Sequence, residues 1–100
     1  MQDKSQQPDK VVTITLNKDG LPVPDQDPIE VKKDNQKVRW CADFDFKIDV
    51  DGYTDMKYNK TSASKDPFNC STGTFPAVRR YKYSITANGK TNDPDLDVKP

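Results

Sequence analysis

A thirteen-residue run in which every second side chain is apolar constrains the fold more strongly than any other feature. Successive side chains along a strand point to opposite faces, so the run predicts β-structure with one buried face and a fixed register. Strands usually span about 5–6 residues. We therefore expect a break, bend or bulge near Ala42 and Asp43, leaving two strands that share one hydrophobic face. The apolar positions are Val38, Trp40, Ala42, Phe44, Phe46, Ile48 and Val50.

Shorter segments of the same kind lie on either side of this run. Residues 10–17 alternate apolar side chains with threonine, and a short strand is expected at 29–31. Residues 81–87 alternate again and lead into Asn88-Gly89, the strongest short hairpin signal, which favours a type I′ turn. The return strand is expected over 90–99.

Two stretches lack the two-residue period. Residues 21–28 contain three prolines, which remove backbone donors, so an extended crossing loop is predicted there. Pro94 should mark an irregular point in the return strand. Residues 53–76 are rich in Thr, Ser, Asn and Lys, and we expect one long connection over them.

The residue types argue against helices. Of the 16 acidic residues only Glu30 is Glu, and Asp competes with helical backbone hydrogen bonds. Val, Ile and Thr are frequent and suit strands. The prediction is an all-β Greek-key sandwich of about six or seven strands, formed by one domain over 10–100 behind a flexible tail at 1–9.

Two segments resemble strands of cupredoxin-like domains. Val38-Arg39-Trp40 resembles the early V-x-F/W strand, and residues 80–85 resemble the aromatic strand that enters the final hairpin. Residues 89–98 are similar to the end of small bacterial cupredoxin-like proteins of unassigned function. The resemblance covers roughly residues 10–99 and implies a cupredoxin-like fold.

The same resemblance implies that no copper is bound. Copper-binding members use two His, one Cys and usually a Met. This chain contains no His, and Ile85 stands where the ligand Cys would be. The downstream His region reads Thr86-Ala87-Asn88. We therefore expect a copper-free member without a cofactor.

The only cysteines, Cys41 and Cys70, are separated by 28 residues. A disulfide, two free thiols and half of a zinc site are the possible states. A zinc site needs about four ligands, which a chain without His supplies poorly. The strand period places Cys41 on the face opposite Trp40, where a bridge to Cys70 would tie down the long connection. The disulfide is the preferred interpretation, and it predicts a periplasmic or secreted protein.

A dense acidic stretch is a second place in the sequence where a metal site could form. A calcium loop of the EF-hand type would need further ligands and a closing Glu, which are absent. A solvated outer strand face is the simpler interpretation, with a hard-cation site as the alternative. The stretch consists of Asp43, Asp45, Asp49, Asp51 and Asp55.

Several function classes are disfavoured. The formal net charge is zero, so the basic field typical of nucleic-acid binders is missing. No apolar run is long enough for a membrane span. Without His, the usual general base near neutral pH is absent. We expect a monomeric, non-enzymatic, extracytoplasmic module that binds an unknown protein or small ligand through residues 53–76. The alternative is a metal-handling protein that uses the Asp cluster to bind calcium or another hard cation.

Overall fold

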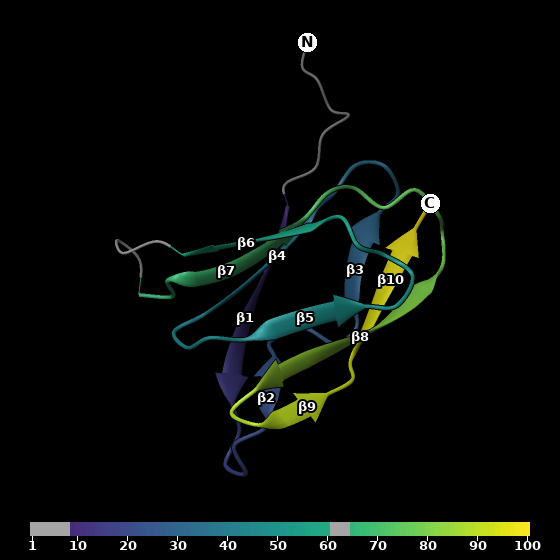
Figure 1. The fold of residues 1–100 in the computed structure, drawn as a ribbon. Coiled ribbons are helices and arrows are strands. Elements are labelled where there is room, and N and C mark those ends of the chain that lie inside the picture. The colour runs from purple at the N-terminus through teal and green to yellow at the C-terminus, as the bar shows by residue number, and fades with distance from the viewer. Residues whose placement is uncertain (1–8, 61–64) are drawn as a thin grey trace.

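The computed structural model describes residues 9–60 and 65–100, which form ten strands in two facing sheets (Figure 1). The first sheet has the order β2-β1-β4-β7-β6, and the second has the order β3-β10-β8-β5, with β9 paired to β8. The predicted all-β sandwich is confirmed, with ten strands in place of six or seven. Residues 1–8 of the predicted tail lie outside the described residues. The strands are β1 Lys10–Leu16, β2 Pro22–Pro24, β3 Ile29–Lys32, β4 Val38–Ala42, β5 Lys47–Val50, β6 Met56–Lys60, β7 Phe68–Thr72, β8 Arg80–Ala87, β9 Lys90–Asn92 and β10 Asp95–Lys99.

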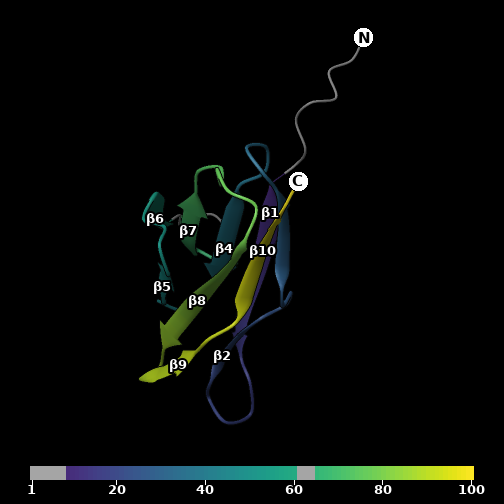
Figure 2. The ribbon, with the colours of Figure 1, turned by 90° about the vertical axis from the view of Figure 1, so that its right-hand side faces the viewer.

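The long alternating run is divided, as predicted, but its two halves belong to different sheets. β4 ends at Ala42 in the first sheet, and β5 begins at Lys47 in the second. Trp40 and Ile48 are both almost completely buried, so one parity faces one core from two opposite walls. Figure 2 shows the two layers from the side, with β4 and β8 in different layers. The alternation of apolar residues predicts which side chains face the core, but it does not predict to which sheet the strand belongs.

Aromatic side chains join the two sheets inside the sandwich. The ring centroids of Trp40 on β4 and Tyr83 on β8 lie 5.3 Å apart, and the Trp40 indole N–H donates to the Tyr83 hydroxyl at 3.4 Å. Tyr81, Tyr53 and Phe75 form a second aromatic group, in which the last two rings stack at 4.3 Å. Trp40 and the tyrosines of β8 therefore lie in the core, as the strand period predicts.

The Asn88-Gly89 turn and the return strand follow the sequence closely. Both turn residues have positive φ, 57° and 71°, as a type I′ turn requires. The Asn88 side-chain amide also donates to the Gly20 carbonyl at 3.2 Å, which ties this hairpin to the β1–β2 turn. The return segment pairs with β8 as β9 and β10, and Pro94 lies in the irregular stretch between them.

The outward side chains of the second sheet form a ladder of opposite charges. Arg80 on β8 binds Asp97 on β10 at 2.6 Å and Asp95 at 3.4 Å. Lys82 reaches Asp95 at 2.9 Å. The Arg80 hydrogen bond lowers the pKa of the Asp97 carboxyl. The charges on this face are therefore largely neutralised by their neighbours.

The prediction of one long connection over residues 53–76 is wrong. β6 and β7 form an antiparallel pair within it, with Tyr58 opposite Cys70, and β7 continues the first sheet beside β4. Every β6 residue except Met56 is exposed, and only Met56 and Tyr58 alternate with polar residues before Lys60 follows, so the apolar period is too short to signal this strand. The segment at 21–28 contains the short edge strand β2, whose position agrees with its prolines.

In residues 9–60 and 65–100 there is no helix of the length and apolar character that a membrane span requires.

Candidate binding pocket beside β5, β6 and β7

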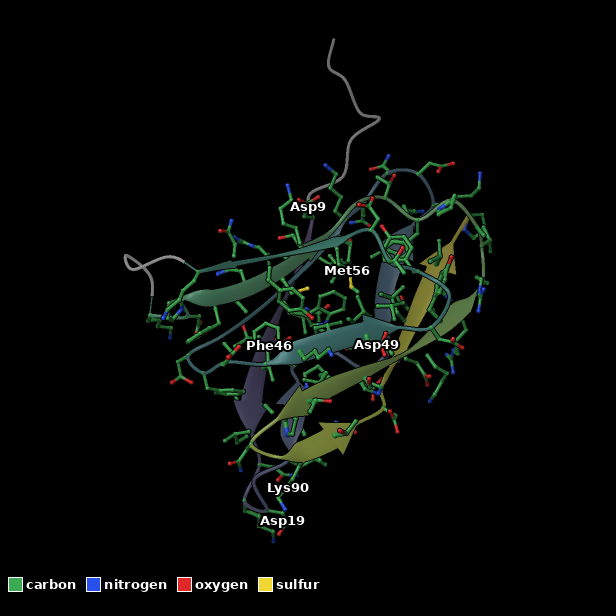
Figure 3. The ribbon with its side chains drawn as sticks, viewed as in Figure 1. Asp9, Asp19, Phe46, Asp49, Met56 and Lys90 are labelled. Carbon is green, nitrogen blue, oxygen red and sulfur yellow. The ribbon has the colours of Figure 1, made fainter. Side chains whose placement is uncertain are left out.

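A pocket of about 330 Å³ opens at one side of the sandwich, between the β4–β5 crossover and the β6–β7 pair. Figure 3 shows Phe46 just before β5 and Met56 at the start of β6, with side chains filling the space between the two elements. Both residues pack on the core. The pocket is thus an indentation of the sandwich side, lined by the β4–β5 crossover and by residues of β6 and β7. Its lining consists of Asp45, Phe46, Tyr58, Asn59, Lys60, Phe68 and Asn69.

Tyr58 fixes the distance between the two walls. Its hydroxyl accepts a hydrogen bond from the Ile48 N–H at 2.8 Å and donates one to the Ile48 carbonyl at 3.0 Å. The Asp51 N–H donates to the Lys82 carbonyl, so Asp51 and, by the alternation of an antiparallel ladder, Asp49 bond to β8. The N–H and C=O groups of Ile48, which lies next to Asp49, therefore face away from β8. Partial burial raises the pKa of the Tyr58 hydroxyl, which keeps its proton for donation.

The rim of the pocket carries one positively and one negatively charged side chain. The Lys60 ammonium lies 4.8 Å from the centre of the Phe68 ring, a cation–π geometry. Asp45 stands at the crossover and is exposed. The Asn69 amide donates to the Pro67 carbonyl at 3.2 Å, which holds its side chain in place. Aromatic rings line the interior, and charges and amides surround them.

This lining suits binding by stacking and a few polar contacts. Ligand pockets are usually apolar, hold a small number of placed polar groups and measure about 300–1,000 Å³. At about 330 Å³ this pocket has room for a small ring or for one large side chain of a partner.

Comparisons with protein-family models, with curated proteins and with solved structures found no match. The function therefore has to be argued from the geometry of this chain. Four predicted features of the sequence bear on it: the cysteines, the aspartates, the copper positions and the long connection.

The predicted disulfide between Cys41 and Cys70 is absent, and both cysteines are free. Cys70 lies opposite Trp40 in the β4–β7 register, whereas Cys41 lies opposite Asn69. Directly opposed residues share a face, so Cys70 points into the core with Trp40 and Cys41 points outward. The sequence placed Cys41 correctly, and the error lay in assigning Cys70 to a loop. The predicted periplasmic or secreted location loses the support of the bridge and stays a prediction.

The two thiols have different surroundings. Cys70 is completely buried, and this burial raises the pKa of its thiol to about 11. Cys41 is half-buried on the outer face, where its sulfur lies 3.8 Å from the Thr13 hydroxyl oxygen. The Cys70 thiol thus stays protonated near neutral pH and acts as an apolar packing group.

The aspartates proposed as an alternative cation site are not brought together. All five are exposed, two in the crossover, one on β5 and two between β5 and β6. Across 9–60 and 65–100, no three His, Cys, Asp or Glu side chains gather closely enough to hold a metal ion. The residues concerned are Asp43, Asp45, Asp49, Asp51 and Asp55.

The positions implied for copper do not fit that metal. Ile85 is completely buried and pairs with Ile48 on β5, so it is a packing residue. Asn88 occupies the type I′ turn and donates to Gly20. Neither position offers the thiolate or imidazole that a blue-copper centre needs.

Sequence reasoning missed most of the pocket. Phe46 was predicted as a core residue, but Tyr58, Lys60 and Phe68 lay in the supposed long connection. One signal was present: Phe68, Cys70 and Thr72 alternate with polar residues, and Cys70 and Thr72 are buried. That weak period would have located β7 and, through it, the strand beside it.

Proposed function

We propose that this protein is a non-enzymatic binding module on a copper-free cupredoxin-like sandwich. It holds a small ring-shaped ligand, or a large side chain of a partner, in the pocket beside β5, β6 and β7. The observation that carries this proposal is the grouping of Phe46, Tyr58 and Phe68 around one opening with Lys60 and Asp45 at its rim. Aromatic rings with nearby charges favour a flat apolar group that bears a polar substituent.

The cupredoxin-like part of the proposal is supported by where the resembling segments lie. Val38-Arg39-Trp40 opens β4, and residues 80–85 form most of β8. Their rings, Trp40 and Tyr83, touch across the core.

The non-enzymatic part is supported by the chemistry of the lining. Among its seven described residues there are rings, amides, one ammonium and one carboxylate, and no nucleophile beside a base. The Cys70 thiol is buried with a raised pKa, which suppresses the reactive thiolate. These groups bind a ligand without providing a reaction step.

The test is a titration of the 100-residue protein with indole, phenol, benzoate and benzylamine, followed by ¹H–¹⁵N NMR. We expect shift changes at Phe46, Tyr58 and Phe68, and recovery of each compound unaltered. Phe68→Ala should weaken binding at least about tenfold, because it removes one wall and the cation–π partner of Lys60. Val11→Ala, an exposed apolar residue on the outer face of β1, is the matched control.

Absence of shifts at millimolar concentrations of all four compounds would overturn the proposal. So would binding that Phe68→Ala leaves unchanged in a variant whose core resonances show that it is folded.

A further inference from the structure

On the edge strands β2, β3 and β5, several outward backbone groups are missing or are capped by the chain itself. β2 has three residues, two of which are prolines without an N–H. The Lys32 N–H at the end of β3 donates to the Gln36 side chain at 2.9 Å. On β5, the Tyr58 hydroxyl holds both backbone groups of Ile48, and the Val50 carbonyl accepts from the Tyr53 N–H at 3.1 Å.

The edge of β6 is open along its length. The Gly73 N–H donates to the Asp55 carbonyl at 3.1 Å, so these opposed residues form a hydrogen-bonded pair. Hydrogen-bonded and non-bonded pairs alternate along an antiparallel ladder. Lys57 therefore bonds to β7, whereas the N–H and C=O groups of Tyr58 and Lys60 point away from the sheet. Within the residues that the structure describes, nothing caps those groups.

The open edge is also positively charged. β6 carries Lys57 and Lys60 and no acidic residue, and Arg39 lies in the same cross-strand row as Lys57. None of these three cations forms an ion pair with another described residue, in contrast to the paired charges of the second sheet. A second copy of β6 would bring like charges together, whereas an acidic strand would be attracted.

We infer that β6 takes up an extended acidic segment of a partner protein as an added strand. Its backbone hydrogen-bonds to Tyr58 and Lys60, its acidic side chains face Lys57, and one apolar side chain on its inner face enters the pocket. Added strands lie about 4.8 Å away and alternate their side chains between faces, so one peptide can make both contacts. This inference rests on the proposed function, because the pocket is the one described above.

The probe is an acetylated, amidated heptapeptide of sequence Glu-Val-Glu-Phe-Glu-Val-Glu, added to the 100-residue protein. We expect ¹H–¹⁵N shifts and slowed amide exchange at Tyr58 and Lys60. Lys60→Pro removes an outward N–H without breaking a ladder bond, and should weaken binding at least about tenfold. Lys60→Ala is the matched control: it keeps the N–H, loses the charge, and should weaken binding by no more than about fivefold.

Three outcomes would overturn the inference: no change at β6, equal affinities of Lys60→Pro and Lys60→Ala, or equal binding of a peptide with Lys in place of Glu. Self-association through β6 without peptide would also overturn it, in favour of a second copy. If the small ring compounds still bind while the peptide does not, the binding pocket stands and only the added strand fails.

Discussion

The edge strands β5 and β6 are joined by the Tyr58 side chain next to the pocket, yet one edge is closed and the other is open. At β5, Ile48 has its N–H and C=O satisfied by the Tyr58 hydroxyl. At β6, the backbone groups of that same Tyr58 point outward without a cap among the described residues. One residue thus closes the edge of the opposite strand with its side chain and leaves its own edge available with its backbone.

This difference shows that a single residue can decide whether the backbone groups at a sheet edge are hydrogen-bonded or free to bind another strand. A part-buried hydroxyl with two backbone partners closes an edge by satisfying it. Lysines protect an edge by repelling strands of like charge, and they leave its backbone groups uncapped.

The sharpest way to break the comparison is one truncation on each strand. Ile48→Ala should lower the free energy of unfolding by about 2–5 kcal/mol, because Ile48 is almost completely buried. Asn59→Ala on β6 is exposed and should change it by less than about 0.5 kcal/mol. Urea denaturation of both variants measures this, and similar losses would show that β6 is as tightly integrated as β5.

A second prediction concerns Cys70, which lies under Tyr58 on the neighbouring strand. Its thiol pKa is raised by burial from about 9 to about 11, so the unfolded chain loses this proton first. The contribution of this thiol to the free energy of unfolding is fully present below pH 9. It should be lost as the pH rises through 11, which lowers the free energy of unfolding by about 2–3 kcal/mol. Urea denaturation between pH 8 and 11 should show a smaller decline for Cys70→Ala, although that variant starts from a lower stability. Parallel declines would exclude Cys70 as the cause.

Removing the hydroxyl that closes β5 should make the two edges alike. Tyr58→Phe should lower the free energy of unfolding by about 1–3 kcal/mol, because two backbone groups of Ile48 lose their partner. Hydrogen exchange at the Ile48 amide should accelerate. Tyr53→Phe, whose hydroxyl donates to the Thr74 carbonyl instead, is the control and should leave the Ile48 amide unaffected.

The smallest expected effect on stability is at the lysines. Lys57→Ala combined with Lys60→Ala should change the free energy of unfolding by less than about 0.5 kcal/mol. The same double variant should self-associate more strongly in sedimentation, because the open edge loses its repelling charges. An unchanged sedimentation profile would mean that charge is not what keeps two β6 edges apart.

The sequence predicted those parts of the fold in which one face is buried. The alternation around Trp40 and Ile48 and the positive-φ turn at Asn88 each encode a local requirement that few other structures satisfy. The sheet to which each strand belongs was not predictable, because either wall of the same core gives the same parity.

The candidate site was less predictable because it lies where the local signal is weakest. β6 is exposed along most of its length, and its apolar period is limited to Met56 and Tyr58. Cys70 was misplaced for the same reason, since its burial depends on the register between β7 and β4. The predicted monomer, the absence of nucleic-acid binding and the location of the protein stay predictions.

The position of β10 has a consequence for the order in which the domain can form. Although β10 is the last strand, it lies inside its sheet between β3 and β8. Its parallel pairing joins Leu96 to Ile29, a sequence separation of 96 − 29 = 67 residues. Contacts this distant slow folding, because a long loop must close before they form. During synthesis, β3 therefore has no hydrogen-bonded neighbour in its sheet until β10 has been made, and the second sheet cannot be completed before then.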